Sequence, residues 1–142
     1  MSAQNFSNHR RFHPPYHFFM LPLTLMGLIA SGYHWYKSDA SNCYVNALIF
    51  VIFFILFSLA GFVRIYALKA QDRAIRAEEN LRHFILTGKP LDHQLRMGQI
   101  IALRFASDKE LAELANRAVN EKLSALDIKK AIKEWRPDYY RV

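Results

Sequence analysis

The chain has 142 residues, of which 52% are hydrophobic, with a formal charge of +7 and one cysteine. A single cysteine excludes an intramolecular disulfide framework and any zinc site built from several cysteines. Apolar residues gather in the first half and most charges follow Val63. We therefore expect one small domain joined to a membrane part, with each segment suited to a different solvent.

The first fifteen residues, MSAQNFSNHRRFHPP, are polar, aromatic and basic, and they end in a pair of prolines. Proline lacks a backbone N–H and disfavours helix in the residue before it. We predict a polar segment over residues 1–15 that lies in the cytoplasm or at the membrane interface. A cleaved signal peptide is the weaker alternative, because large aromatic residues follow the apolar stretch where small residues should precede a cleavage site.

Residues 16–36, YHFFMLPLTLMGLIASGYHWY, contain no formally charged side chain and carry aromatic residues at both ends. A helix of this length spans roughly 30 Å, the thickness of a bilayer core, so we predict a first membrane span. Pro22 is expected to kink this helix and to leave the Phe18 carbonyl without its usual donor. Gly27 and Ser31 form a small-xxx-small pair at which a second span can approach closely.

Residues 44–87 are predicted to form one long helix, because no proline or glycine separates the apolar first part from the charged second part. Residues 44–63 carry no formal charge and no polar stripe, so we predict that they cross the membrane. A buried core helix of a soluble protein is the alternative, which so short a chain seldom needs. Gly88 suits a left-handed position after the helix, and Pro90 cannot continue it.

The second part of this long helix carries a narrow apolar stripe. Small or apolar residues recur at alternating spacings of four and three, the a/d pattern of a helix that packs on another helix. This alanine seam consists of Val63, Ala67, Ala70, Ala74, Ala77, Leu81 and Phe84. It can pack on the protein's own C-terminal helices or on a partner helix, and both alternatives stay open. Asp72 with Arg76, and Glu78 with Arg82, are predicted ion pairs on the opposite side.

Residues 90–142 are predicted to form three short helices without strands or repeats. The first covers Leu95–Ala106. Some fifty residues are few for an independent core, so we expect this small bundle to pack on the long second helix. The predicted fold is thus an all-α membrane protein: a two-helix transmembrane hairpin over 16–63, whose second helix extends into a cytoplasmic helical domain over 64–142.

Two capping boxes are expected to begin the last two helices. In each, a serine is followed three residues later by an acidic residue: Ser107 with Glu110, and Ser124 with Asp127. Trp135 continues the apolar periodicity of the last helix, which we expect to end at Pro137.

Basic residues near the span ends predict the topology, because lysine and arginine at these positions stay on the cytoplasmic side. These residues are Arg10, Arg11, Arg64, Lys69, Arg73 and Arg76. We expect both termini to lie in the cytoplasm of a bacterium, the hairpin to lie in the inner membrane, and the loop 37–43 to face outward. The basic segment is expected to attract anionic lipid headgroups.

No pattern of catalytic residues is evident. The spans hold no aspartate, glutamate, lysine or arginine for an ion pathway, and phosphate loops, nucleophile elbows and HExxH motifs are absent from the sequence. The carboxylates after residue 69 lie close in sequence to lysine or arginine, as on a solvated face. His9, His13 and His17 are spaced by four, but two prolines interrupt the helical face that would align them. We expect no enzyme activity, no cofactor and no metal site.

Four stretches carry a resemblance over essentially the whole chain. They are the opening QNF with Asn8, His9, Arg11, His13, Pro14 and Pro15; YALKAQDRAIRAEENLRHFILTGKPL from Tyr66; IIALRFASD from Ile100; and WRPDYYRV from Trp135. Together they resemble a family of short uncharacterised two-span membrane proteins from Bacteroidota. The resemblance implies a cytoplasmic-membrane protein with a helical cytoplasmic tail, and it implies no activity. Arg96 and Gly98 depart from the hydroxyl cap and helix former expected before Gln99.

We expect a non-enzymatic accessory or scaffolding subunit of a larger inner-membrane complex. Its partners would be other membrane proteins or a second copy of itself, in addition to the bilayer. The residues expected at these contacts are Gly27, Ser31, Ala70, Ala74, Ala77 and Leu81. A membrane-tethered module for RNA or the ribosome is the alternative, although acids interleaved with the basic residues make nucleic acid an unlikely partner. A haem or metal carrier that uses the histidines is a second alternative.

Overall fold

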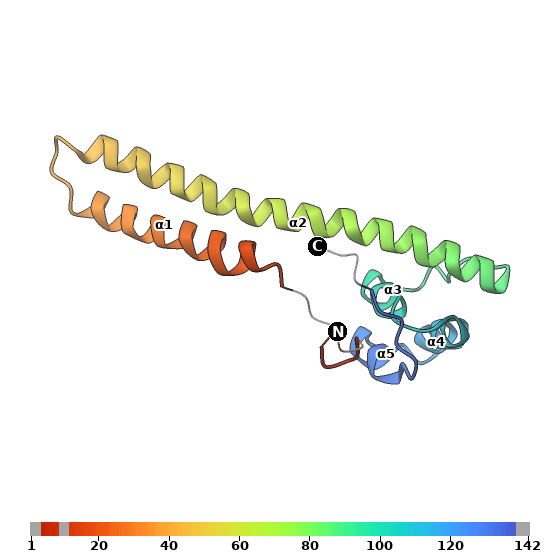
Figure 1. Ribbon diagram of the computed structural model, residues 1–142. Helices are drawn as coiled ribbons and strands as arrows, with labels where there is room; N and C mark the ends of the chain where they lie inside the picture. Colours follow the sequence, from red (N-terminus) through yellow and green to blue (C-terminus); the bar gives the residue numbers. More distant parts are fainter. Residues whose placement is uncertain (1–3, 9–11, 139–142) are drawn as a thin grey trace. The chain divides into compact units, whose positions relative to one another are not determined.

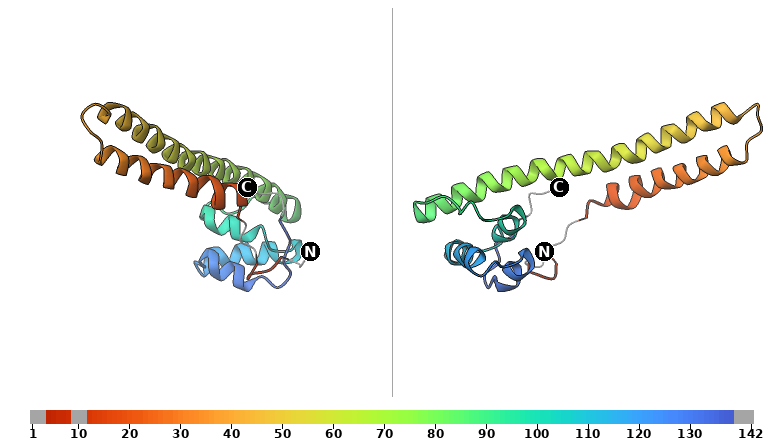
Figure 2. Two further views of the ribbon diagram at one scale, coloured as in Figure 1. Left: turned by 60° about the vertical axis from the view of Figure 1, so that its left-hand side comes forward. Right: turned by 180° about the vertical axis from the view of Figure 1, so that it is seen from behind.

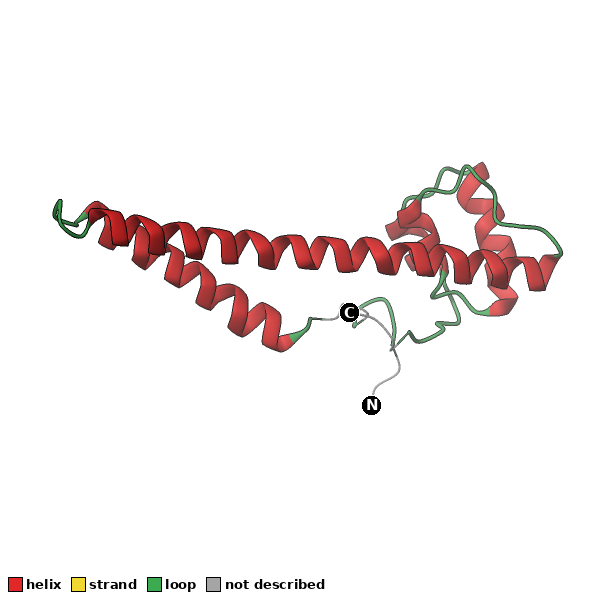
Figure 3. Cartoon of the chain, turned by 90° about the horizontal axis from the view of Figure 1, so that it is seen from above, coloured by secondary structure: helices red, strands yellow, loops and turns green. Residues whose placement is uncertain are grey.

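The computed structural model describes residues 4–8 and 12–138. The predictions made for His9, Arg10 and Arg11, and for the last four residues of the C-terminal motif, lie outside the described residues. Within the described ranges the chain consists of one π-helix and five α-helices without a β-strand (Figure 3). The predicted all-helical class is therefore confirmed.

The elements follow one another along the chain as η1 (Pro15–Met20), α1 (Leu21–Tyr36), α2 (Cys43–Thr87), α3 (Met97–Leu103), α4 (Asp108–Asn120) and α5 (Ala125–Ala131) (Figure 1). They form two compact units. The hairpin unit comprises Arg11–Ala67, and the bundle unit comprises Met1–Arg10 with Leu68–Val142. The first part of α2 belongs to the hairpin unit and its second part to the bundle unit, so the predicted single long helix is confirmed.

In the hairpin unit, α1 runs antiparallel to the first part of α2 (Figures 1 and 2). Both η1–α1 and α2 are long and apolar enough to cross a membrane, and almost none of their apolar stretches is buried. Contacts at three levels join the two helices: the Trp35 ring lies 5.4 Å from the Phe50 ring, the Phe53 ring covers Gly27, and the Tyr16 hydroxyl donates to the Ala60 carbonyl at 2.8 Å.

The first turns of the hairpin are π-helical. The Leu21 N–H donates to the carbonyl of Tyr16, five residues earlier, directly before Pro22. Pro22 has no N–H to donate, and the π-helical turns lie directly before it. In the same stretch the Thr24 hydroxyl donates to the Met20 carbonyl at 2.9 Å. The disturbance expected at Pro22 therefore takes the form of a different helix type.

The end of α2 agrees with the prediction. Thr87 is its last residue, and Gly88 has a φ of 73°, in the left-handed region that glycine tolerates best. The Gly88 N–H donates to the Phe84 carbonyl at 2.8 Å, which satisfies one of the last carbonyls of the helix. The buried His83 ring then fixes the following loop, because its Nδ1 lies 2.8 Å from the Lys89 carbonyl and must donate to it.

The core of the bundle unit lies between α3, α4, α5 and one face of α2. Ile75 of α2 belongs to this core, and Glu79 and His83 are buried on the same face because they follow at spacings of four. The other core residues are Leu95, Ile100, Ala102, Leu103, Phe105, Ala106, Leu111, Leu114, Ala115, Ala118, Ile128 and Ile132. The bundle thus packs on α2 as expected, but through this face and not through the alanine seam.

Helix α3 is shorter than the predicted Leu95–Ala106. It starts after Arg96, whose N–H donates to the side-chain oxygen of Gln99 at 2.7 Å. The amide nitrogen of Gln99 in turn donates to the Leu123 carbonyl at 2.8 Å. A buried glutamine therefore caps the helix from within its first turn, which explains why no hydroxyl residue is needed before it.

One of the two predicted capping boxes is confirmed and the other is wrong. The Ser124 hydroxyl donates to the Asp127 carboxylate at 2.6 Å, and the Asp127 N–H donates back to the hydroxyl oxygen at 3.2 Å. Ser107, in contrast, makes no side-chain cap. The carboxylate of Glu110 accepts instead from the N–H groups of residues 133 and 134, at 3.1 and 3.2 Å. A tertiary contact with the C-terminal segment has replaced the local one.

The last helix ends at Ala131 and not at Pro137, so the prediction that Trp135 lies on it is wrong. Trp135 forms an isolated antiparallel bridge with Ala106, and the Arg136 N–H donates to the Phe105 carbonyl at 2.8 Å. The Trp135 and Phe105 rings lie 5.2 Å apart. The extended segment thus buries part of the indole and satisfies backbone groups after α3, which a continued helix would not do.

Candidate interaction site on the second helix

The predicted contact residues divide between the two units. Gly27 and Ser31, which belong to the hairpin unit, already make contacts within that unit. The Phe53 ring covers Gly27, where an added Cβ would overlap it. Ser31 is buried, and its hydroxyl donates to the Leu28 carbonyl at 3.0 Å. The close approach expected at this pair is therefore made by the protein's own α2.

The alanine seam in the bundle unit is exposed. Ala70, Ala74 and Ala77 are all exposed, and Leu81 keeps 59% of its surface accessible. With about 100° of rotation per residue, the seam lies roughly opposite the buried face of α2 that contacts the bundle core. Packing of these seam residues on the protein's own C-terminal helices is therefore wrong. The remaining alternative is a partner helix.

Further apolar and charged residues border the seam. Ile85 extends the apolar surface of the seam next to Phe84, and these two residues are 73% and 52% exposed. Arg73 lies on one flank and Glu78 on the other, and both side chains are exposed. Among the described residues, neither makes an ion pair. This part of α2 thus presents a short apolar stripe between opposite charges.

The predicted ion pair between Glu78 and Arg82 is wrong, because Arg82 binds other carboxylates. Its Nη1 lies 2.9 Å from an oxygen of Glu79, and its Nη2 lies 2.6 Å from one of Asp108. It also donates to the Ala106 carbonyl at 2.8 Å. Arg82 and Glu79 keep only 12% and 7% of their side-chain surfaces exposed, so these charges join α2 to the start of α4 in a partly dry environment.

Sequence reasoning missed this cluster because it assigned all the carboxylates to a solvated face. Glu79 lies four residues after Ile75 and four before His83, so it occupies the buried face of α2. That periodicity was the available signal. The second oxygen of Glu79 lies 3.6 Å from the Arg136 guanidinium, which brings the C-terminal segment into the same cluster.

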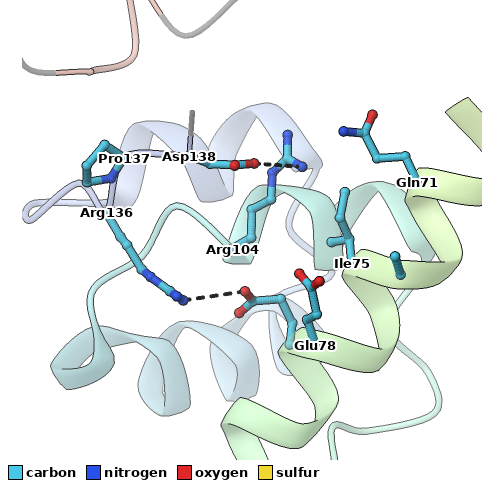
Figure 4. Close-up of a pocket in the computed structure, with 9 residues that line it drawn as sticks. Gln71, Ile75, Glu78, Arg104, Arg136, Pro137 and Asp138 are labelled. Atoms are coloured by element: carbon cyan, nitrogen blue, oxygen red, sulfur yellow. Dashed lines mark ion pairs between the residues drawn. The ribbon is translucent and has the colours of Figure 1, made fainter. Parts of the chain in front are cut away.

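A charged pocket of about 220 Å³ lies beside the seam (Figure 4). Its lining residues are Gln71, Ala74, Ile75, Glu78, Glu79, Arg104, Arg136, Pro137 and Asp138. Arg104 points toward Asp138, with 3.1 Å between Nη1 and the carboxylate, and only a tenth of its side chain is exposed. Burial lowers the Arg104 pKa, while Asp138 opposes this effect. This ion pair joins the end of α3 to the C-terminal segment.

Two further grooves lie on either side of the seam. One of about 450 Å³ includes Arg73 and Arg76 beside Ala77, with Asp92 as its acidic residue. The other, of about 360 Å³, includes Glu78, Glu79 and Asp108 beside Leu81, with two arginines. The two grooves therefore carry opposite excess charge on the two flanks of one apolar stripe.

Of the three histidines spaced by four, His13 and His17 are described and His9 lies outside the described residues. In the described ranges, no three side chains of histidine, cysteine, aspartate or glutamate lie close enough to hold a metal ion. The His17 ring nitrogen Nδ1 lies 3.0 Å from the carbonyl of His13, so this pair interacts through ring and backbone. Cys43 is exposed at the first residue of α2.

No curated protein and no solved structure matches the chain. One family model matches residues 1–142, and it describes a family of unknown function, DUF6526. This match agrees with the resemblance to an uncharacterised family over the whole chain. The chain belongs to this family of unknown function, DUF6526.

Proposed function

We propose that the chain is a non-enzymatic integral membrane protein that serves as an accessory or scaffolding subunit of a larger assembly in a bacterial inner membrane. The observation that carries the proposal is the apolar outer surface of the hairpin unit. Large apolar side chains are exposed along both helices, among them Phe18, Met26, Ile29, Ile52, Phe54, Ile55, Leu59 and Phe62. A soluble protein rarely exposes so continuous an apolar surface, whereas a bilayer solvates it.

The proposed topology places both termini in the cytoplasm. The Asp138 N–H donates to the side-chain oxygen of Gln4 at 2.7 Å, so the N-terminal segment and the bundle belong to one unit. Two crossings by η1–α1 and α2 would return the chain to the side from which it started. Arg64 and Lys69 follow the second crossing, and basic residues at that position favour the cytoplasmic side.

The seam supports the role of a subunit. A second helix that leaves the membrane and keeps an exposed apolar stripe offers a surface for another helix close to the bilayer. Its alanines allow close approach of the two backbones. The ion pairs Arg82–Asp108 and Glu79–Arg136 join the bundle to the opposite face of α2, and the stripe stays exposed.

The test is gentle detergent extraction of a tagged copy from native membranes, followed by size measurement and mass spectrometry of the attached proteins. We expect a particle that contains a defined set of other membrane proteins. Ala74→Glu should remove them, because it places a charge in the seam, whereas Asn116→Glu on exposed α4 should not. Recovery of the chain in the soluble fraction, or of a particle without any other protein, would overturn the proposal.

A further inference from the structure

The spacing of the apolar residues and the positions of the charges on the exposed face of α2 indicate which partner covers it. We propose that two copies of this chain pair in parallel along the alanine seam, with Arg73 of each copy against Glu78 of the other. This inference rests on the proposed membrane location, because insertion of both copies by the same rule gives them the same orientation. It names one partner within the assembly proposed above.

The first step is the geometry of the stripe. Ala70, Ala74, Ala77 and Leu81 follow the alternating spacing of a two-helix interface, and all four are exposed within the bundle unit. Phe84 continues the pattern with half of its surface accessible. The buried residues Ile75, Glu79 and His83, which contact the bundle, lie on the opposite face of the helix.

The second step is the position of the charges. Arg73 directly precedes the core position Ala74, and Glu78 directly follows the core position Ala77, so they occupy the g and e positions of the heptad pattern. In a parallel pair, a g residue meets the e residue that lies five positions later on the partner helix, and such pairs set orientation and register. Glu78 lies five positions after Arg73. Two-fold symmetry produces this contact twice.

The third step concerns the opposite orientation. In an antiparallel pair, g positions face g positions and e positions face e positions, so Arg73 and Glu78 would not meet and their attraction would be lost. The structure also leaves both side chains available, since Arg82 takes Glu79 and Asp108 and not Glu78. The charges therefore favour a parallel second copy.

The test is disulfide cross-linking in membranes from cells that express the full chain with Cys43→Ser and Ala74→Cys. Symmetric core positions of a parallel pair come within the Cα separation that a disulfide spans, so oxidation should give a covalent dimer. The control Asn116→Cys places the thiol on exposed α4 and should give none. Absence of a dimer from Ala74→Cys would overturn the inference.

Charge exchange tests the register. In the Ala74→Cys background, Arg73→Glu alone and Glu78→Arg alone should each reduce the dimer yield several-fold, and the two together should restore it. No reduction by either single change, or no restoration by both, would overturn the proposed pairing. Other membrane proteins captured with a tagged copy that gives no dimer would overturn this inference while leaving the proposed function standing. Loss of the chain from the membrane fraction would overturn both.

Discussion

Replacing Glu79 by alanine should destabilise the bundle unit far more than replacing its neighbour Glu78. The two carboxylates are adjacent in sequence but lie on different faces of α2. Glu79 is 6% exposed and contacts Arg82 at 2.9 Å and Arg136 at 3.6 Å, whereas Glu78 is exposed and makes no ion pair among the described residues. The comparison therefore isolates the buried face of the helix.

The size of the stability loss depends on which partners Arg82 retains after Glu79 is removed. Removal of one partner from a buried ion pair costs about 3–5 kcal/mol when the other charge is left alone. Arg82 retains Asp108 at 2.6 Å and the Ala106 carbonyl at 2.8 Å, so its charge stays partly compensated. We expect a loss of about 2–3 kcal/mol, at or below the lower end of that range. For a unit of this size, the loss lowers the unfolding midpoint by roughly 10 °C or more.

The assay is thermal unfolding of the detergent-solubilised full chain, followed through the fluorescence of Trp135 in a Trp35→Phe background. Trp135 packs on Phe105 in the bundle core, so its emission reports this unit. Glu78→Ala should change stability by no more than about 0.5 kcal/mol, as surface substitutions usually do. If Glu78→Ala were as destabilising as Glu79→Ala, our assignment of the buried face would be refuted.

Three further predictions concern the hairpin and the last helix. Gly27→Leu should cost about 1–3 kcal/mol in SDS-driven separation of the two spans, because its side chain would overlap the Phe53 ring; Gly61→Leu has open space around it, and an equal effect would contradict this packing. Ser124→Ala should lower the free energy of unfolding by about 1 kcal/mol, since it removes the confirmed cap, and an unchanged urea midpoint would contradict this. Hydrogen bonds from Ser124 lower the Asp127 pKa below its ordinary value of 3.8, so the stabilisation is complete above that pH and disappears as pH falls through the lower value. The stability difference between wild type and Asp127→Asn should therefore shrink below about pH 4 in urea titrations, and a difference that is constant with pH would contradict the assignment.

The long elements could be predicted because their signals are local and repeated. The absence of proline and glycine between its apolar and charged parts specifies α2 as one helix, and the left-handed preference of Gly88 specifies its end. The serine at 124 predicts a cap that needs only a residue three positions away. Each of these features depends only on neighbours in sequence. They could therefore be predicted, and the structure confirms them.

The wrong predictions have the opposite cause, which is competition from residues distant in sequence. Glu110 does not bind Ser107, because its carboxylate accepts from two N–H groups of the C-terminal segment. Trp135 does not lie on a helix, because it packs on the Phe105 ring and forms a backbone bridge with Ala106. The buried face of α2 was also misassigned, because an alanine-rich a/d pattern resembles a packing face more closely than one that contains Glu79. Local propensity and capping patterns do not register the tertiary contacts of Glu110 and Trp135.

The insertion of the hairpin in a membrane underlies the whole account, and the native Cys43 tests it without any substitution. This single cysteine is exposed at the start of α2, in the turn between the two predicted crossings. Intact spheroplasts that express the chain are treated with a membrane-impermeant maleimide, and the membranes are then washed with alkaline carbonate. The account predicts that Cys43 is labelled from outside and that the labelled chain stays in the membrane pellet. Labelling only after permeabilisation, or release of the chain by carbonate, would contradict it.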